Sequence, residues 1–275
     1  MKLKTSWHSP RLDQKVTVAR WGEIGTPILM FPTAGGDAEE IERFLVIESL
    51  SEFLEQGRIK IYSCDSVAGR GMLAREGTPA DRMRAMNNFQ AFIHRELVPA
   101  IRTDCNDDGI GVIAAGSSIG AFNALAAVCR FPDAFTHALC MSGTYDLLRF
   151  LKADPTEDFV VSSPLHYLAG LGGEHLERLR TRFVVLASGR GRAEDIDESW
   201  RVASLLGRKG VPNRVDDWGE EWHHDWPTWR HMLVRYLGEL VPAVDTEPVS
   251  EQQGTGRDRQ AVGGSPPGSR RSAGT

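Results

Sequence analysis

The residues from 109 to 129 form an uncharged stretch that restricts the fold of this chain more than any other feature. A run of this length meets the crude length criterion for a membrane span. Its polar residues Ser117, Ser118 and Asn123, its glycines, and an apolar pattern that changes halfway do not suit a lipid-facing helix. The stretch therefore predicts a buried strand, a tight turn and a buried helix.

Short β-rich runs alternate with longer amphipathic segments along the rest of the chain. The predicted strands are 16–21, 27–31, 59–64, 111–115, 138–142, 183–188 and 213–217. We expect the first two to form an antiparallel pair at a sheet edge. Helical spacing of apolar residues predicts helices over 41–54, 83–97, 119–130 and 229–240. This alternation predicts an α/β fold, a mostly parallel sheet covered by helices on both faces, with ligands bound beyond the carboxyl ends of the strands.

Composition divides the chain into a folded unit and a tail. After Leu240 there is no Leu, Ile, Met, Cys or aromatic residue, and the segment is rich in Gly, Ser, Pro, Gln and Arg. Such a segment cannot bury enough apolar surface to order itself. We therefore expect one folded domain over residues 1–242 and a disordered C-terminal tail over 243–275.

The net charge and the cysteine pattern limit the binding partners and the cellular compartment that we expect for this chain. The formal net charge of −5 provides no global positive field to attract nucleic acid or anionic lipid. The four cysteines are scattered without a CxxC pair, which is typical of free thiols in a reducing cytosol. The N-terminal lysines are not followed by the apolar stretch of a secretory signal. We expect a cytoplasmic protein with neither a nucleic-acid nor a membrane partner.

The sequence Gly116-Ser117-Ser118-Ile119-Gly120 matches the pattern G-x-S-x-G, directly after an apolar strand and directly before a helix. A nucleophile elbow needs this context, because the strand must turn abruptly into a helix and small neighbours must let the backbones fit. The match predicts Ser118 as a nucleophile, with the backbone N–H of Ile119 as one donor to an oxyanion. The alternative is a plain structural turn, since Gly and Ser are common in turns.

A serine nucleophile needs a base, which in this architecture follows the acid along the chain and lies on a loop after a strand. His223 and His224 satisfy both conditions. His224 is preferred, because Asp225 beside it resembles a helix N-cap that fixes the backbone; His223 remains the alternative. The alternative without a catalytic role is that the two histidines lie at the surface and pack against neighbouring tryptophans. A metal site is disfavoured, because no HExxH motif or cysteine partner accompanies the pair.

The acid is expected on the loop after the strand 183–188. Glu194, Asp195 and Asp197 all lie there, and Asp197 is expected to cap the next helix, which leaves Glu194 and Asp195 undistinguished. The second oxyanion donor is expected on the loop 32–36, where two glycines permit close backbone approach to a ligand. Ala34 is the first candidate and Gly35 the next; a glycine turn leading into a helix is the alternative.

The chain resembles the putative-esterase, or esterase D-like, branch of the α/β-hydrolases. Four blocks carry the resemblance: FPTAGG, GRIKIYSCDS, AAGSSIGAFNA followed by CMSGTYDL, and WHHDWPTWRHML. It implies the α/β-hydrolase fold, and it implies His224 as the base, because the family's histidine directly precedes Asp-Trp. It also favours Glu194, since the family's acid often follows a glycine-rich turn. The segment 66–79 departs from the family by lacking a Ser-Trp-Tyr type of sequence beside the pocket.

These residues predict a serine hydrolase that cleaves small-molecule carboxylic esters through an acyl-enzyme, with no metal or organic cofactor. The same residues would support acyl transfer if an alcohol or sugar replaced water. A catalytically silent scaffold that binds a ligand or partner is the alternative from another class. The segment 146–181 is long enough to form a small cap over the site, which Phe150, Phe159, Leu165 and Tyr167 would line, unless they are ordinary packing.

Overall fold

A single eight-stranded sheet organises the part of the chain that the structure, a computed structural model, describes: residues 1–73 and 77–241. The strand order is β1-β2-β4-β3-β5-β6-β7-β8. The strands are β1 (Lys2–Ser9), β2 (Gln14–Trp21), β3 (Thr26–Phe31), β4 (Ile59–Cys64), β5 (Val112–Ser117), β6 (Phe135–Met141), β7 (Phe183–Ser188) and β8 (Asn213–Asp217). From β4 to β8 all neighbours are parallel, whereas β1 with β2 and β2 with β4 are antiparallel.

The central strand β5 shows why the parallel part of the sheet is apolar throughout. Val112 and Ala114 belong to the core on one face, and Ile113 and Ala115 belong to the core on the other. A strand covered on both sides has no polar face, so its sequence is a continuous apolar run. The charge-free stretch of the sequence is thus β5 followed by the buried helix α7 (Ile119–Arg130).

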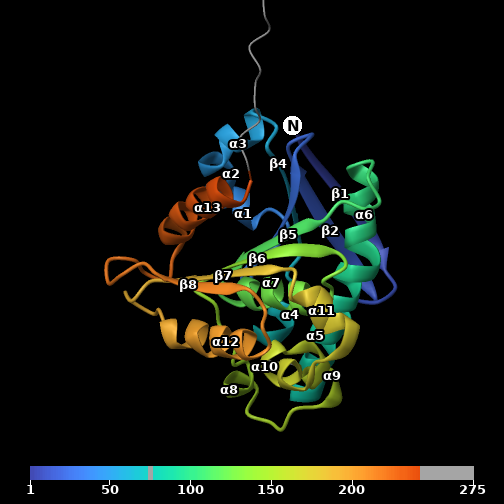
Figure 1. Ribbon diagram of the computed structural model, residues 1–275. Helices are drawn as coiled ribbons and strands as arrows, with labels where there is room; N and C mark the ends of the chain where they lie inside the picture. The colour runs from blue at the N-terminus through green and yellow to red at the C-terminus, as the bar shows by residue number, and fades with distance from the viewer. Residues whose placement is uncertain (74–76, 242–275) are drawn as a thin grey trace, which may run out of the picture. The chain divides into compact units, whose positions relative to one another are not determined.

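Helices cover both faces of the sheet, as Figure 1 shows. One face carries α1 (Glu40–Arg43), α2 (Val46–Ser49), α3 (Ser51–Glu55) and α13 (Trp226–Leu240). The other carries α4 (Val67–Leu73), α5 (Pro79–Phe92), a π-helical turn (Ile93–Leu97), α6 (Val98–Asp104), α7, and α12 (Ile196–Arg208). Between β6 and β7 lie α8 (Leu148–Leu151), α9 (Glu157–Ser162), α10 (Pro164–Tyr167), a 3₁₀ turn (Leu168–Gly170) and α11 (Gly173–Leu179).

The predicted antiparallel pair of the strands 16–21 and 27–31 is wrong. These strands are β2 and β3, and β4 lies between them, antiparallel to β2 and parallel to β3. The antiparallel edge is formed by β1 and β2 instead. β1 was not predicted, because the pattern KLKTSWHS is mostly polar and six of its eight residues lie exposed.

The other strands of the sequence analysis are present, and β4, β7 and β8 have the predicted bounds. The predicted helix 41–54 is broken into α1, α2 and α3, because Leu45 adopts a left-handed conformation with φ of 61° between the first two. None of the helices among the described residues combines the length and the apolarity needed to cross a bilayer. The predicted tail, residues 243–275, lies outside the described residues.

Candidate active site

Ser118 lies at a sharp turn between β5 and α7. Its φ of 58° and ψ of −123° are unusual for a residue with a side chain, and such strain costs about 1–3 kcal/mol. The backbone around it holds the turn: Ser118 N–H donates to Met141 O on β6 at 3.0 Å, and Thr144 N–H donates to Ser118 O at 3.2 Å. The serine is partly exposed, whereas Ser117 is buried. This is the geometry expected of a nucleophile elbow.

Both flanking glycines are required by close backbone contacts. A Cβ at Gly116 would lie 2.3 Å from the carbonyl oxygen of Gly120. A Cβ at Gly120 would lie 2.6 Å from the carbonyl oxygen of Phe31, at the end of β3. The start of α7 therefore packs directly on the end of β3, where the loop 32–36 begins.

The N–H of Ile119 is the first donor of α7. A helix has no internal acceptor for the N–H groups of its first turn. Among the described residues, no backbone acceptor is found for Ile119 N–H. It is therefore available to bind an oxygen beside Ser118, and its role as an oxyanion donor stays a prediction.

His224 and Glu194 lie together beyond the ends of β7 and β8. The separation of His224 Nδ1 and Glu194 Oε2 is 3.8 Å, an ion-pair contact that is longer than a hydrogen bond. The Glu194 side chain is 1% exposed and that of His224 is 23% exposed. No hydrogen bond joins the Ser118 hydroxyl to His224 within the described part of the chain; in unliganded enzymes such contacts are often long.

Two serine hydroxyls hold the buried Glu194 carboxylate. Ser142 Oγ donates to Glu194 Oε1 at 2.5 Å, and Ser188 Oγ donates to Glu194 Oε2 at 2.8 Å. A buried carboxylate needs such donors, because burial of an unpaired charge is costly. The bonds also fix the direction in which the carboxylate faces His224.

Trp229 on α13 supports both members of this pair. Its indole Nε1–H donates to Ser142 Oγ at 2.9 Å, which orients the Ser142 hydroxyl toward Glu194. The same ring packs edge-to-face with the His224 imidazole at 5.1 Å between centroids. One side chain of the last helix thus contacts His224 directly and Glu194 through Ser142.

The structure separates Glu194 from the neighbouring acids. Asp195 is exposed, with its carboxylate 3.8 Å from Arg149. The expectation that Asp197 caps the next helix is wrong: the N-cap position of α12 is Asp195, and Asp197 lies in the first turn. The helix begins earlier than expected because Ile196 is already buried in the core.

The two histidines also have different surroundings. His223 Nδ1 accepts the backbone N–H of Arg192 at 3.0 Å, whereas His224 faces Glu194. Asp225 is the N-cap of α13, as predicted, and its carboxylate accepts the Thr228 N–H at 3.1 Å. The cap and the His224 N–H, which donates to Arg192 O at 3.1 Å, fix the backbone on both sides of the imidazole.

The loop 32–36 lies between β3 and α1. Thr33 donates twice to the carboxylate of Glu40, and Gly36 N–H donates to Thr33 O at 3.1 Å. Ala34 is half-buried, and its N–H has no backbone acceptor among the described residues. The loop therefore presents a second unused donor near the elbow.

The expected cap segment is mostly core. Phe159 is fully buried, and Leu165 and Tyr167 pack against the same hydrophobic cluster. Phe150 is 55% exposed and lies under the guanidinium of Arg149. The packing interpretation therefore holds for three of the four residues proposed to line a cap.

Several residues around the site were not found by sequence reasoning. They are Ser142, Ser188 and Glu40, whereas Trp229 was considered only as packing against the histidines. Ser188 ends β7 and Ser142 directly follows β6, and a serine at this end of a parallel strand is the signal that was available. No local pattern could mark Glu40 as buried. Glu39 and Glu42 are glutamates in the same short segment, and both are partly exposed.

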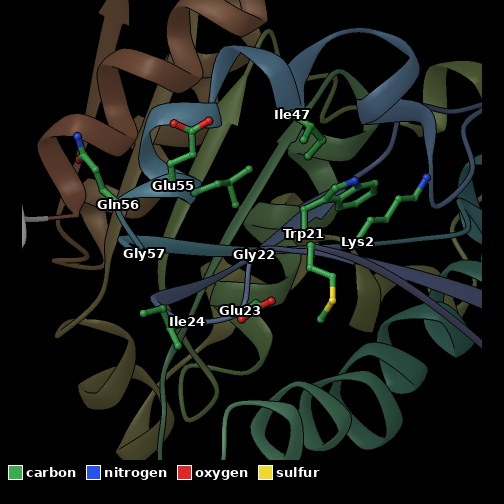
Figure 2. Close-up of a pocket in the computed structure, with 11 residues that line it drawn as sticks. Lys2, Trp21, Gly22, Glu23, Ile24, Ile47, Glu55, Gln56 and Gly57 are labelled. Carbon is green, nitrogen blue, oxygen red and sulfur yellow. The ribbon is translucent and has the colours of Figure 1, made fainter.

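A hollow of about 510 Å³ lies elsewhere on the sheet, and Figure 2 shows the residues that line it. It is lined by residues such as Lys2, Trp21, Ile24 and Glu55, and it lies where β2 ends and where β3 and β4 begin. Ser118 follows the carboxyl end of β5, at the opposite edge of the parallel strands. The hollow is therefore separate from the candidate active site. Within residues 1–73 and 77–241, no group of three or more His, Cys, Asp or Glu side chains could hold a metal ion.

A family model described as putative esterase matches residues 62–240, which include Ser118, Glu194 and His224. The chain belongs to the putative esterase family. It is an esterase-type hydrolase, and its sheet and helices form the α/β-hydrolase fold expected from the sequence. No curated protein sequence matches the chain.

Solved structures of this putative esterase fold are similar over most of the chain. A ferulic acid esterase is 16% identical, with a TM-score of 0.67, covering 88% of this chain and 97% of its own. An S-formylglutathione hydrolase from Agrobacterium tumefaciens is 13% identical, with a TM-score of 0.65 and coverages of 86% and 93%. A fluorophosphonate-binding serine hydrolase of Staphylococcus aureus is 14% identical, with a TM-score of 0.57 and coverages of 88% and 98%. At these identities the likeness is one of fold.

Proposed function

We propose that the protein hydrolyses small-molecule carboxylic esters through an acyl-enzyme, with Ser118 as nucleophile, His224 as base and Glu194 as the acid that orients it. The observation that carries this proposal is the buried Glu194 carboxylate facing His224 Nδ1 on the loop beyond the sheet. An imidazole held by Nδ1 presents Nε2 on the opposite side of the ring, where a serine proton can be taken.

The chemistry follows from these positions. Ser118 Oγ attacks the ester carbonyl carbon while its proton passes to His224 Nε2, and the carbonyl oxygen becomes an oxyanion. The N–H groups of Ile119 and Ala34 donate to this oxyanion. The carbonyl re-forms, the C–O bond to the alcohol breaks, and His224 protonates the leaving alkoxide. Water then repeats the sequence on the acyl-Ser118 ester and releases the carboxylic acid.

Glu194 stabilises the positive charge that His224 acquires in both transition states. A carboxylate in a water-excluded site interacts more strongly with an imidazolium than it would in water. Its two serine donors keep it oriented, so the site does not reorganise when the charge appears.

Hydrolysis of a p-nitrophenyl ester series, from acetate to longer acyl chains, tests the proposal. Ser118→Ala and His224→Ala should each lower kcat/KM by at least about 10³-fold while folding is retained. Ser117→Ala is the matched control, since the Ser117 hydroxyl is buried without a hydrogen-bond partner in the described residues. Full activity in either of the first two variants would contradict the assigned roles.

A fluorophosphonate probe separates an enzyme from a silent scaffold. Labelling of wild type at Ser118, and not of Ser118→Ala, is the expected result; no labelling of folded wild type would favour a binding scaffold. Added alcohols test whether acyl transfer competes with hydrolysis. A ferulic acid ester and the thioester S-formylglutathione are the first natural-type substrates to assay, because the names of two structural relatives refer to ferulic acid and to S-formylglutathione. The cytoplasmic location and the lack of a nucleic-acid partner stay predictions.

A further inference from the structure

Glu40 is a buried carboxylate that the proposed reaction does not use. It lies at the start of α1 and is 6% exposed. Its Oε2 accepts the backbone N–H of Thr33 at 2.7 Å, and its Oε1 accepts the Thr33 hydroxyl at 2.6 Å. Burial of a carboxylate is costly unless it is hydrogen-bonded, and here both bonds go to one residue of the loop 32–36. The Glu40 carboxylate therefore helps to fix the position of the loop 32–36.

The position of Thr33 determines the direction of the Ala34 N–H. Thr33 is bonded through its N–H to Glu40, and through its carbonyl oxygen to the N–H of Gly36. A peptide unit is planar and trans, so the Ala34 N–H points away from the Thr33 carbonyl in the same plane. Two hydrogen bonds of Thr33 thus set the direction of a donor that has no backbone acceptor in the described residues.

Gly36 leaves the space in which Glu40 reaches Thr33. A Cβ at this buried position would lie 2.4 Å from a carboxylate oxygen of Glu40 and 2.7 Å from Pro32 Cβ. On the other side of the loop, a Cβ at Gly69 of α4 would lie 2.7 Å from the Ala34 carbonyl oxygen. The loop is therefore packed tightly from two directions.

The same loop begins beside the elbow. The start of α7 packs on the carbonyl oxygens of Phe31 and Pro32, which would lie 2.6 and 2.9 Å from a Cβ at Gly120. Ile119 N–H, the neighbour of Gly120 in α7, is the other unused donor. The two donors are consequently carried by backbone segments in direct contact.

We propose that Glu40 is a positioning residue that holds the Thr33–Ala34 peptide so that the Ala34 N–H stabilises the oxyanion. This inference rests on the esterase function proposed above. Glu40 touches no reacting atom in this scheme; it acts through Thr33. Its loss should raise the energy of the transition state and leave ground-state binding of the ester nearly unchanged.

Glu40→Ala and Glu40→Gln, assayed with p-nitrophenyl esters, test the inference. Glu40→Ala should lower kcat by about 10²-fold, the effect typical of a lost oxyanion donor, with KM changed by less than about 3-fold. Glu40→Gln should stay within about 10-fold of wild type, because its amide can accept the Thr33 N–H and donate to the Thr33 hydroxyl. Affinity for a boronic acid that forms a tetrahedral adduct with Ser118 should fall in parallel with kcat.

Glu39→Ala is the matched control, because Glu39 is the preceding glutamate and pairs with Lys2 and Lys4 at the surface. If Glu40→Ala does not fold, Thr33→Val removes only the hydroxyl bond and should lower kcat by about 5- to 10-fold. Wild-type kcat in folded Glu40→Ala, an effect on KM alone, or a Gln variant as impaired as Ala would overturn the inference.

Fluorophosphonate labelling distinguishes failure of this inference from failure of the proposed function. Labelling of wild-type Ser118 with equally fast labelling of Glu40→Ala would overturn the role of Glu40 alone. No labelling of wild type would overturn the proposed function, and the role of Glu40 with it. Slower labelling of Glu40→Ala than of wild type and Glu39→Ala is the expected result.

Discussion

Two buried carboxylates lie to either side of Ser118 in the strand order, Glu194 after β7 and Glu40 after β3, and their donors differ. Glu194 accepts two side-chain hydroxyls and lies 3.8 Å from an imidazole that can become charged. Glu40 accepts a backbone N–H and the hydroxyl of the same residue. In the proposed reaction, Glu194 thus faces a histidine whose charge changes, and Glu40 holds a peptide that has to stay in place.

The difference shows how one type of side chain serves two purposes. The negative charge is essential only where it opposes a developing positive charge. Where the task is to hold a backbone segment, two acceptor positions of the right geometry suffice, and a neutral amide provides a substitute. The same substitution, Glu to Gln, is therefore expected to have very different effects at the two positions.

Glu194→Gln gives the largest expected effect. Without the carboxylate, the imidazolium of His224 loses its counter-charge and its preferred tautomer, and kcat should fall by about 10³- to 10⁴-fold. Steady-state kinetics on p-nitrophenyl acetate would measure this beside Glu40→Gln. Asp195→Asn, one residue away and 54% exposed, is the control and should remain within about 3-fold. Equal losses in the two Gln variants would remove the distinction between the carboxylates.

Removal of the serine donors should have an intermediate effect. Ser142→Ala deletes a hydrogen bond to a buried charged group, worth about 1.5–3 kcal/mol, and leaves the Trp229 N–H without its acceptor. We expect kcat/KM to fall by about 10-fold or more. Ser188→Ala should have a smaller effect, because Ser188 does not accept from a second side chain in the described residues.

Ser63→Ala is the control for these two variants. Ser63 on β4 is buried like Ser142 and Ser188, but its hydroxyl has no hydrogen-bond partner among the described residues. Its removal should leave kcat/KM near the wild-type value. If Ser63→Ala lowered activity as much as Ser142→Ala, loss of packing and not loss of the Glu194 bond would explain the result.

The helix cap beside His224 should give the smallest effect, chiefly on stability. Asp225→Ala removes the side-chain acceptor of the Thr228 N–H and should lower the free energy of unfolding by about 1 kcal/mol. Thermal denaturation would show this as a fall in Tm of about 2–4 °C. Asp195 occupies the N-cap position of α12 without a side-chain cap bond, so Asp195→Ala should change Tm less. A larger shift for Asp195→Ala would contradict the capping assignment.

Much of the fold was predictable because its signals are local. β5, the turn at Ser118 and α7 form one continuous segment, and the apolar run, the glycines and the helical spacing are all read within it. Asp225 was recognised as a cap for the same reason, since a cap acts on the next three residues. Strand order has no such local signal, and the insertion of β4 between β2 and β3 was therefore missed.

The sequence by itself determined the nucleophile candidate, the pair of histidines, the group of acids and the loop with its glycines, because each is a short pattern beside a strand. The local pattern left Glu194 and Asp195 undistinguished, and the family resemblance favoured Glu194. Only the tertiary structure showed that the Glu194 side chain is the buried one and found the partners of Glu194 and Glu40. Ser142 and Glu194 are 52 positions apart, and Ser142 and Trp229 are 87 apart. Parallel strands with long crossovers bring such residues to one edge of the sheet, and packing decides which of two neighbouring carboxylates is buried there.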